Sequence, residues 1–126
     1  LRAYGLFTQG FVRLNLTRAF DARKALEEAL EMFRKQGNEN GIRQCLGNLV
    51  SACIFLTDYQ SAVDFGLQAI EPYRKSQRLS RDVAFTLNGL GSAYQSLGNY
   101  PKALEFFTEA KDAFTSLNAP LLAART

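Results

Sequence analysis

The chain has 126 residues, of which 47% are hydrophobic, and this is enough for one domain with a continuous core. Its 15 basic and 12 acidic residues are mostly interspersed, so the formal charge of +3 indicates a solvated surface more than a charged partner. No apolar run approaches the length of a membrane span and no leader pattern opens the chain, so we expect a soluble cytoplasmic protein without a membrane partner.

The first 40 residues predict two helices joined as a hairpin. The second of these helices is marked by an apolar stripe at helical spacing, which consists of Ala22, Leu26, Ala29 and Phe33. The segment before it, from Tyr4 to Leu16, is apolar and helix-like, but its register stays open. The two alternatives are a stripe of Phe7, Phe11 and Leu14 and a stripe that contains Leu6 and Leu16.

Four further helices are predicted by apolar residues at spacings of three and four, and we expect these residues to form the core. The second hairpin has Ile42, Leu46, Leu49, Cys53 and Leu56, followed by Tyr59, Ala62, Phe65, Ala69 and Tyr73. The third hairpin has Val83, Leu87, Leu90, Tyr94 and Leu97, followed by Tyr100, Ala103, Phe107, Ala110 and Phe114.

Turn residues separate the predicted helices. Asp58 and Asn99 suit N-cap positions, and Gly98 suits the left-handed backbone that ends a helix. The pair 37–38 and Ser80 separate one hairpin from the next. Pro72 falls late in a helical pattern, so we expect a kink or an early end of that helix.

The two ends of the chain suggest a fragment of a longer protein. The chain opens without Met inside a helical pattern, and Pro120 predicts the first turn of a further helix over residues 119–126. Neither end has the polar cap that closes a helical array, so we expect self-association through the uncapped ends.

Two stretches, residues 46–73 and 87–114, repeat one another 41 positions apart. The pairs in register include Leu46/Leu87, Leu49/Leu90, Tyr59/Tyr100, Ala62/Ala103 and Ala69/Ala110. A repeat of this length predicts an all-α stacked array, an α-solenoid of about three antiparallel hairpins over residues 1–40, 41–81 and 82–118. Such arrays are frameworks that display a binding surface.

The third hairpin also carries a specific motif, which consists of Leu87, Leu90, Gly91, Tyr94, Gly98, Tyr100, Ala103, Phe107 and Ala110. This motif resembles the tetratricopeptide repeat, and the period is similar to that of the long variety with 40 to 41 residues. The second hairpin departs from the pattern at Val50, Cys53, Thr57 and Gly66. The resemblance implies a right-handed solenoid that binds proteins.

In the tetratricopeptide family the first helix of each hairpin lines the concave face. The resemblance therefore implies a peptide-binding groove made of Gln44, Asn48, Ser51, Phe55, Phe85, Asn88, Ser92 and Gln95. Amide side chains can hydrogen-bond the backbone of an extended peptide, and exposed phenylalanines suggest apolar contacts. The alternative is that the polar residues form the ordinary solvent-exposed face of an amphipathic helix, while the two phenylalanines pack against a neighbouring repeat.

No pattern predicts catalysis, a metal or another cofactor. The sequence has no His and no phosphate-binding glycine loop. Cys45 and Cys53 stand eight apart on one predicted helix, so their Cα atoms would lie about 12 Å apart, too far for a disulfide. We expect both to be small buried residues in a reducing compartment. The densest basic cluster, around Arg74 and Arg78, has few aromatic neighbours, so we expect no nucleic-acid partner.

Three functions follow as hypotheses. The first is a protein–protein interaction module, not an enzyme, that binds a peptide or partner segment in the concave groove. The second is the sensor portion of a larger bacterial signalling protein, which gates an attached effector domain. The third is a structural array that associates with itself.

Overall fold

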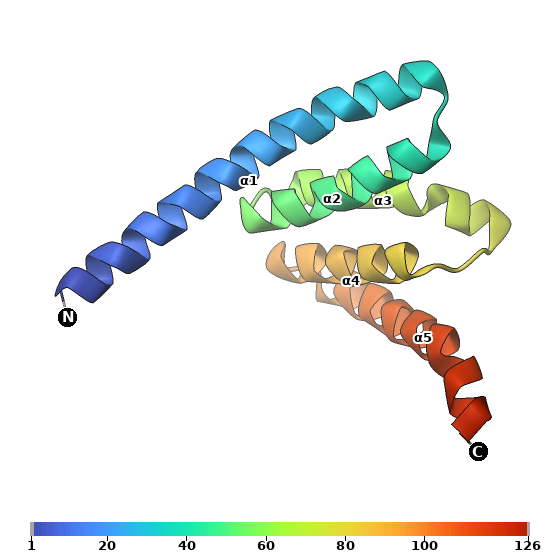
Figure 1. The fold of residues 1–126 in the computed structure, drawn as a ribbon. Helices are drawn as coiled ribbons and strands as arrows, with labels where there is room; N and C mark the ends of the chain where they lie inside the picture. The colour runs from blue at the N-terminus through green and yellow to red at the C-terminus, as the bar shows by residue number, and fades with distance from the viewer. Residues whose placement is uncertain (1, 126) are drawn as a thin grey trace.

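The computed structural model describes the backbone of residues 2–125 and the side chains of residues 15–118. It contains the helices α1 (Arg2–Gln36), α2 (Glu39–Phe55), α3 (Tyr59–Ser76), α4 (Arg81–Ser96) and α5 (Tyr100–Arg125). Each helix packs against the next, and α2 also contacts α4. The hairpins α2–α3 and α4–α5 lie one against the other, with α1 beside the first of them (Figure 1). The predicted all-α array is confirmed.

The first expected hairpin is wrong, because residues 2–36 form one continuous helix. In the α2–α3 hairpin, Leu56 and Thr57 lead into Asp58, whose side chain caps α3. The equivalent residues Leu16 and Thr17 lead into Arg18, which has no side-chain oxygen to cap a helix. No turn signal therefore interrupts α1, and its first half extends away from the hairpins (Figure 1). Of the two alternative stripes, Leu6, Phe7, Phe11 and Leu14 lie outside the described side chains, whereas Leu16 is exposed at 40% and therefore does not take the core position that the second stripe gave it.

The turns between the other helices follow the predicted capping pattern. The four N-cap side chains, each of which accepts a hydrogen bond from the backbone N–H three residues later, are Asn38, Asp58, Ser80 and Asn99. The predicted caps at Asp58 and Asn99 are thus confirmed. Gly98 has a φ of +83°, as expected for its left-handed position, and Thr57 takes the same place in the preceding hairpin with a φ of +62°.

Helices continue past Pro72 and Pro120, which corrects the early end expected at the first and the new helix expected at the second. Helix α3 continues past Pro72 to Ser76, so it does not end early. Pro72 is exposed, and water can therefore reach the Gln68 carbonyl that lacks its helical donor. Helix α5 continues past Pro120 to Arg125, so no separate helix begins at residue 119. The sequence around Pro120 is rich in Ala and Leu and has no glycine that could end α5.

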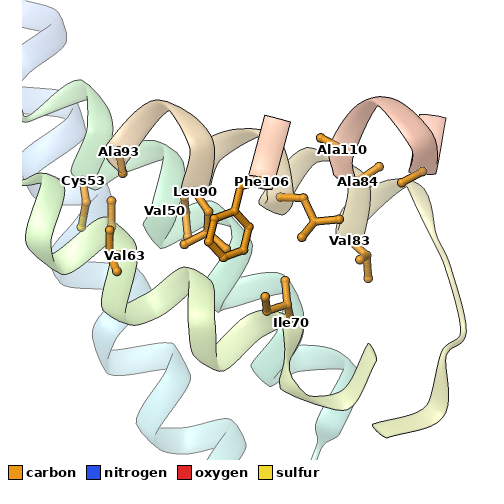
Figure 2. Close-up of a cluster of buried hydrophobic side chains, with 13 residues drawn as sticks. Val50, Cys53, Val63, Ile70, Val83, Ala84, Leu90, Ala93, Phe106 and Ala110 are labelled. Atoms are coloured by element: carbon orange, nitrogen blue, oxygen red, sulfur yellow. The ribbon is translucent and has the colours of Figure 1, made fainter. Parts of the chain in front are cut away.

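The core of the two hairpins contains side chains from four helices. Figure 2 shows its labelled members, which are Val50, Cys53, Val63, Ile70, Val83, Ala84, Leu90, Ala93, Phe106 and Ala110. Leu87 and Leu90 are fully buried, and a side chain of this kind stabilises the fold by about 1.5 to 3 kcal/mol. A second cluster around Leu30, Leu46 and Leu49 joins α1 to the α2–α3 hairpin.

Two predicted core residues, Leu97 and Tyr100, are instead exposed at 45% and 65%. They lie at the turn from α4 to α5. Their counterpart Tyr59 is half-buried, because it packs against the core cluster that α2 and α3 share with α4 and α5. No later helix in the described part of the chain covers Leu97 and Tyr100, since α5 is the last one.

Glycines allow the helices to approach closely at the crossings. A Cβ on Gly91 of α4 would lie 2.7 Å from the Phe107 ring of α5. A Cβ on Gly66 of α3 would lie 2.6 Å from the side chain of Leu90 on α4. Contacts this short are not tolerated, so the ring and the leucine fill the space that a larger residue would need.

Candidate groove between α2 and α4

A groove of about 620 Å³ lies between α2 and α4. It is lined from Arg43 to Phe55 on α2 and from Asp82 to Ser92 on α4, so it follows both helices for most of their length. Seven of the eight predicted site residues line it: Gln44, Asn48, Ser51, Phe55, Phe85, Asn88 and Ser92. Their role in binding a ligand stays a prediction.

The floor of the groove depends on a close contact of the two helices. Gly47 faces Thr86, since a Cβ on Gly47 would lie 3.9 Å from Thr86 Oγ1. Three residues further along each helix, a Cβ on Gly89 would lie 3.0 Å from Val50 Cγ1. Residue numbers thus rise together on the two helices, which shows that α2 and α4 run parallel. Small residues at this contact keep the floor open.

The eighth predicted residue, Gln95, lies on α4 but does not line the groove. The facing pairs Gly47/Thr86 and Val50/Gly89 place Gln95 beyond the level of Phe55, which is the last residue of α2. Gln95 therefore has no residue of α2 opposite it, and the second wall of the groove is missing at that level.

The helical stripes in the sequence did not predict the residues on the floor and at one end of the groove. These are Arg43, Gly47, Val50, Ile54, Asp82, Val83, Thr86 and Gly89, with Ala69 of α3 also reaching the groove. Helical spacing identifies the face of each helix but not the angle at which two helices meet. Gly47, which faces Thr86, and Gly89, which faces Val50, are the sequence signals for a close contact here.

The polar side chains of the groove retain free hydrogen-bonding groups. Among the described residues, the amides of Gln44, Asn48 and Asn88 have no intramolecular hydrogen-bond partner. Thr86 differs, because its hydroxyl donates to the Asp82 carbonyl over 2.8 Å. The free amides can each donate and accept, so they can bind the backbone of an extended chain.

The two phenylalanines of the groove are largely exposed, Phe55 at 51% and Phe85 at 63%. The ring of Phe85 meets Phe114 of α5 edge to face, with centroids 5.1 Å apart. This contact is within one hairpin and fixes the ring without burying it. The ring contact observed for Phe85 is therefore within its own hairpin, and most of both rings is available to a partner.

Charge is confined to one end of the groove. Arg43 and Asp82 are the charged residues among those that line it, and their helix positions are level with each other. Arg43 also donates a hydrogen bond to the Asn40 side chain. The middle of the groove and the Phe55 end are neutral, so the groove has no net charge that would select a strongly charged ligand.

Outside the groove, Cys45 and Cys53 are free and buried, as predicted. Burial raises the pKa of both thiols, which keeps them protonated and unreactive. Within the described part of the chain, no cluster of His, Cys, Asp or Glu is suited to hold a metal ion. None of the described helices combines the length and apolar character that crossing a membrane requires.

A protein-family model described as the tetratricopeptide repeat matches residues 86–113. The match begins at Thr86 on α4 and ends at Ala113 on α5, so it covers most of the hairpin that carries the sequence motif. Comparisons with curated proteins and with solved structures gave no match. The α4–α5 hairpin is thus similar to a tetratricopeptide repeat, and protein binding is the general function that this similarity suggests.

Proposed function

We propose that the chain is a protein-interaction module that binds an extended peptide or partner segment in the groove between α2 and α4, without catalysis of its own. The observation that carries this proposal is the pair of polar walls with free hydrogen-bonding groups. Asn48 and Ser51 come from α2, and Asn88 and Ser92 come from α4. The match of the α4–α5 hairpin to the tetratricopeptide repeat supports the same class of function.

Amide walls suit a peptide backbone for a physical reason. An extended peptide offers N–H and C=O groups along both edges, and an asparagine can satisfy either of them. Each such bond contributes about 0.5 to 1.5 kcal/mol, so affinity would depend on the backbone and not strongly on charge.

The buried free thiols support a reducing compartment such as the cytoplasm, and the 40 to 41 residue period supports the long variety of the repeat.

Alanine variants of the groove test the proposal. The probe is a peptide selected from a random display library on the 126-residue chain, with affinity measured by fluorescence anisotropy. Asn48→Ala and Asn88→Ala should each weaken binding by about fivefold, the equivalent of one lost hydrogen bond. Asn118→Ala is the matched control, because Asn118 is exposed on α5 outside the groove. Unchanged affinity in both groove variants would count against the proposal.

A second candidate function is self-association, favoured by the exposed apolar residues Leu97, Tyr100 and Leu104. Tyr100 and Leu104 are exposed at 65% and 68% and stand one turn apart on α5. A second copy of the chain would cover them. Sedimentation velocity should then show a mass that rises with protein concentration, and Leu104→Glu should return the chain to a monomer. A monomer at all concentrations would exclude this candidate.

A further inference from the structure

The two exposed phenylalanines mark opposite ends of the groove, and their separation can be derived from the helix register. The facing pair Val50/Gly89 sets the common level of the two helices. Phe55 lies five residues beyond Val50, and Phe85 lies four residues before Gly89. Phe55 and Phe85 are therefore offset by nine residues along the parallel helices, which is about 14 Å along the helix axes at 1.5 Å per residue. Both side chains lean toward the start of their own helix, so the lean does not change this distance.

The polar walls fix how an extended peptide would lie. Its backbone N–H and C=O groups point sideways, toward Asn48 on one wall and Asn88 on the other, if the walls bind the backbone as proposed above. The peptide side chains then point alternately to the floor and to solvent. Two side chains that both enter the groove must therefore stand an even number of residues apart.

We infer that the groove selects an extended peptide with two apolar side chains four residues apart, at positions i and i+4. Four residues of extended chain span about 13 Å, which matches the offset of Phe55 and Phe85 along the helix axes. A spacing of three or five gives about 10 or 17 Å and also places one side chain on the wrong face. This inference rests on the proposed function, because it assumes that the walls bind the peptide backbone.

The floor and the charges agree with this ligand. Val50 and Ile54 line the groove between the two rings and offer apolar contacts, while Arg43 and Asp82 stand together at the Phe85 end. No charged residue lines the groove near Phe55. The peptide residues between the two apolar anchors are therefore expected to be uncharged, with small or polar side chains.

Selection from a random library tests the inference. Peptides of about nine residues displayed on phage are selected on the 126-residue chain, and the enriched sequences are resynthesised with one residue inserted or deleted between the apolar positions. We expect enrichment of apolar pairs at i and i+4, and a loss of affinity of about tenfold when the spacing becomes three or five. Phe55→Ala and Phe85→Ala should each remove the preference for one apolar position.

Phe20→Ala is the matched control, because Phe20 is exposed at 63% like Phe85 but lies on α1 outside the groove. It should leave both the affinity and the spacing preference unchanged. Enriched peptides with another spacing, or with no apolar pair, would overturn the inference while leaving the proposed function intact. Failure to enrich any peptide that depends on Asn48 and Asn88 would overturn the proposed function and the inference with it.

Discussion

Arg23 on α1 donates a hydrogen bond from Nη1 to Oδ2 of Asp58 over 2.7 Å, and Asp58 is the residue that caps α3. One carboxylate therefore serves two structural roles. It accepts the backbone N–H of Ser61 at the start of α3, and it ties α1 to the turn between α2 and α3. This contact helps to fix the position of a long helix that has no hairpin partner of its own.

The first prediction concerns pH. The guanidinium of Arg23 and the hydroxyl of Ser61 lower the pKa of Asp58 below its ordinary value of about 3.9. The ionised form is favoured in the folded state, so its stabilisation is present above about pH 4 and is lost as the pH falls through the lowered pKa. Asp58→Asn keeps a capping side chain but removes the charge. We expect a loss of about 0.2 to 1 kcal/mol near neutral pH that shrinks at about pH 3, measured by urea unfolding.

Asp112→Asn is the control for this experiment, because Asp112 is an exposed residue of α5. It should change the stability little at either pH. If Asp58→Asn has the same cost near pH 7 and pH 3, the charge does not contribute and the effect belongs to the cap alone.

The second prediction concerns the close helix contact at Gly91. A Cβ there would lie 2.7 Å from the Phe107 ring, so Gly91→Ala should destabilise the fold by about 1 to 3 kcal/mol despite the better helix propensity of alanine. Gly47→Ala is the matched control, since its nearest neighbour would be Thr86 Oγ1 at 3.9 Å. That variant should gain about 0.5 to 1 kcal/mol. Thermal unfolding of both variants measures the difference, and equal effects would contradict the packing argument.

The third prediction concerns the turn between α2 and α3. Thr57 has a φ of +62°, a conformation that costs a β-branched residue about 1 to 2 kcal/mol. Gly98 holds the equivalent place after α4 without this cost. Thr57→Gly should therefore stabilise the chain, by about 0.5 to 1 kcal/mol after the greater chain entropy of glycine is deducted. Gly98→Ala should have the opposite effect in the same unfolding assay, and a destabilised Thr57→Gly protein would refute the interpretation.

The fourth prediction concerns a contact that recurs between alternate helices. Arg74 on α3 binds Glu109 on α5, with Nη2 and Oε1 2.8 Å apart. At equivalent positions Arg34 on α1 binds the neutral Gln68 on α3 over 2.6 Å. Gln68→Glu should convert this hydrogen bond into an ion pair like the other one. Because these side chains are exposed, the gain should be about 0.2 to 1 kcal/mol at low salt and should largely disappear in about 1 M NaCl.

Most of the fold could be predicted from the sequence because short-range patterns, apolar stripes and capping residues, mark each helix of the repeat. The stripes that contain Leu49 and Leu90 gave the buried faces, and Asp58 and Asn99 gave the helix starts. The continuity of α1 through residues 16–18 could not be predicted in this way. The preceding residues of the turn are present at Leu16 and Thr17, and a single missing cap at Arg18 allows one helix to continue, since elongation of a formed helix is favourable.

The candidate groove was only partly predictable, for a different reason. A helical stripe shows which residues share a face, so Asn48 and Asn88 could be placed together. The depth and length of the groove depend on how closely α2 and α4 approach, and small residues decide that distance, Gly47 opposite Thr86 and Gly89 opposite Val50. The exclusion of Gln95 follows from the length of α2, which ends before that level is reached.

The burial of the two native cysteines has a practical consequence for labelling. Cys45 is 4% exposed and Cys53 is completely buried, and both thiols have a raised pKa. A cysteine introduced at the exposed Gln95, just beyond the Phe55 end of the groove, would react with a maleimide dye far faster than either of them. The wild-type background can therefore be kept, and energy transfer from that dye to one on a peptide would report how far along the helices each end of the ligand lies.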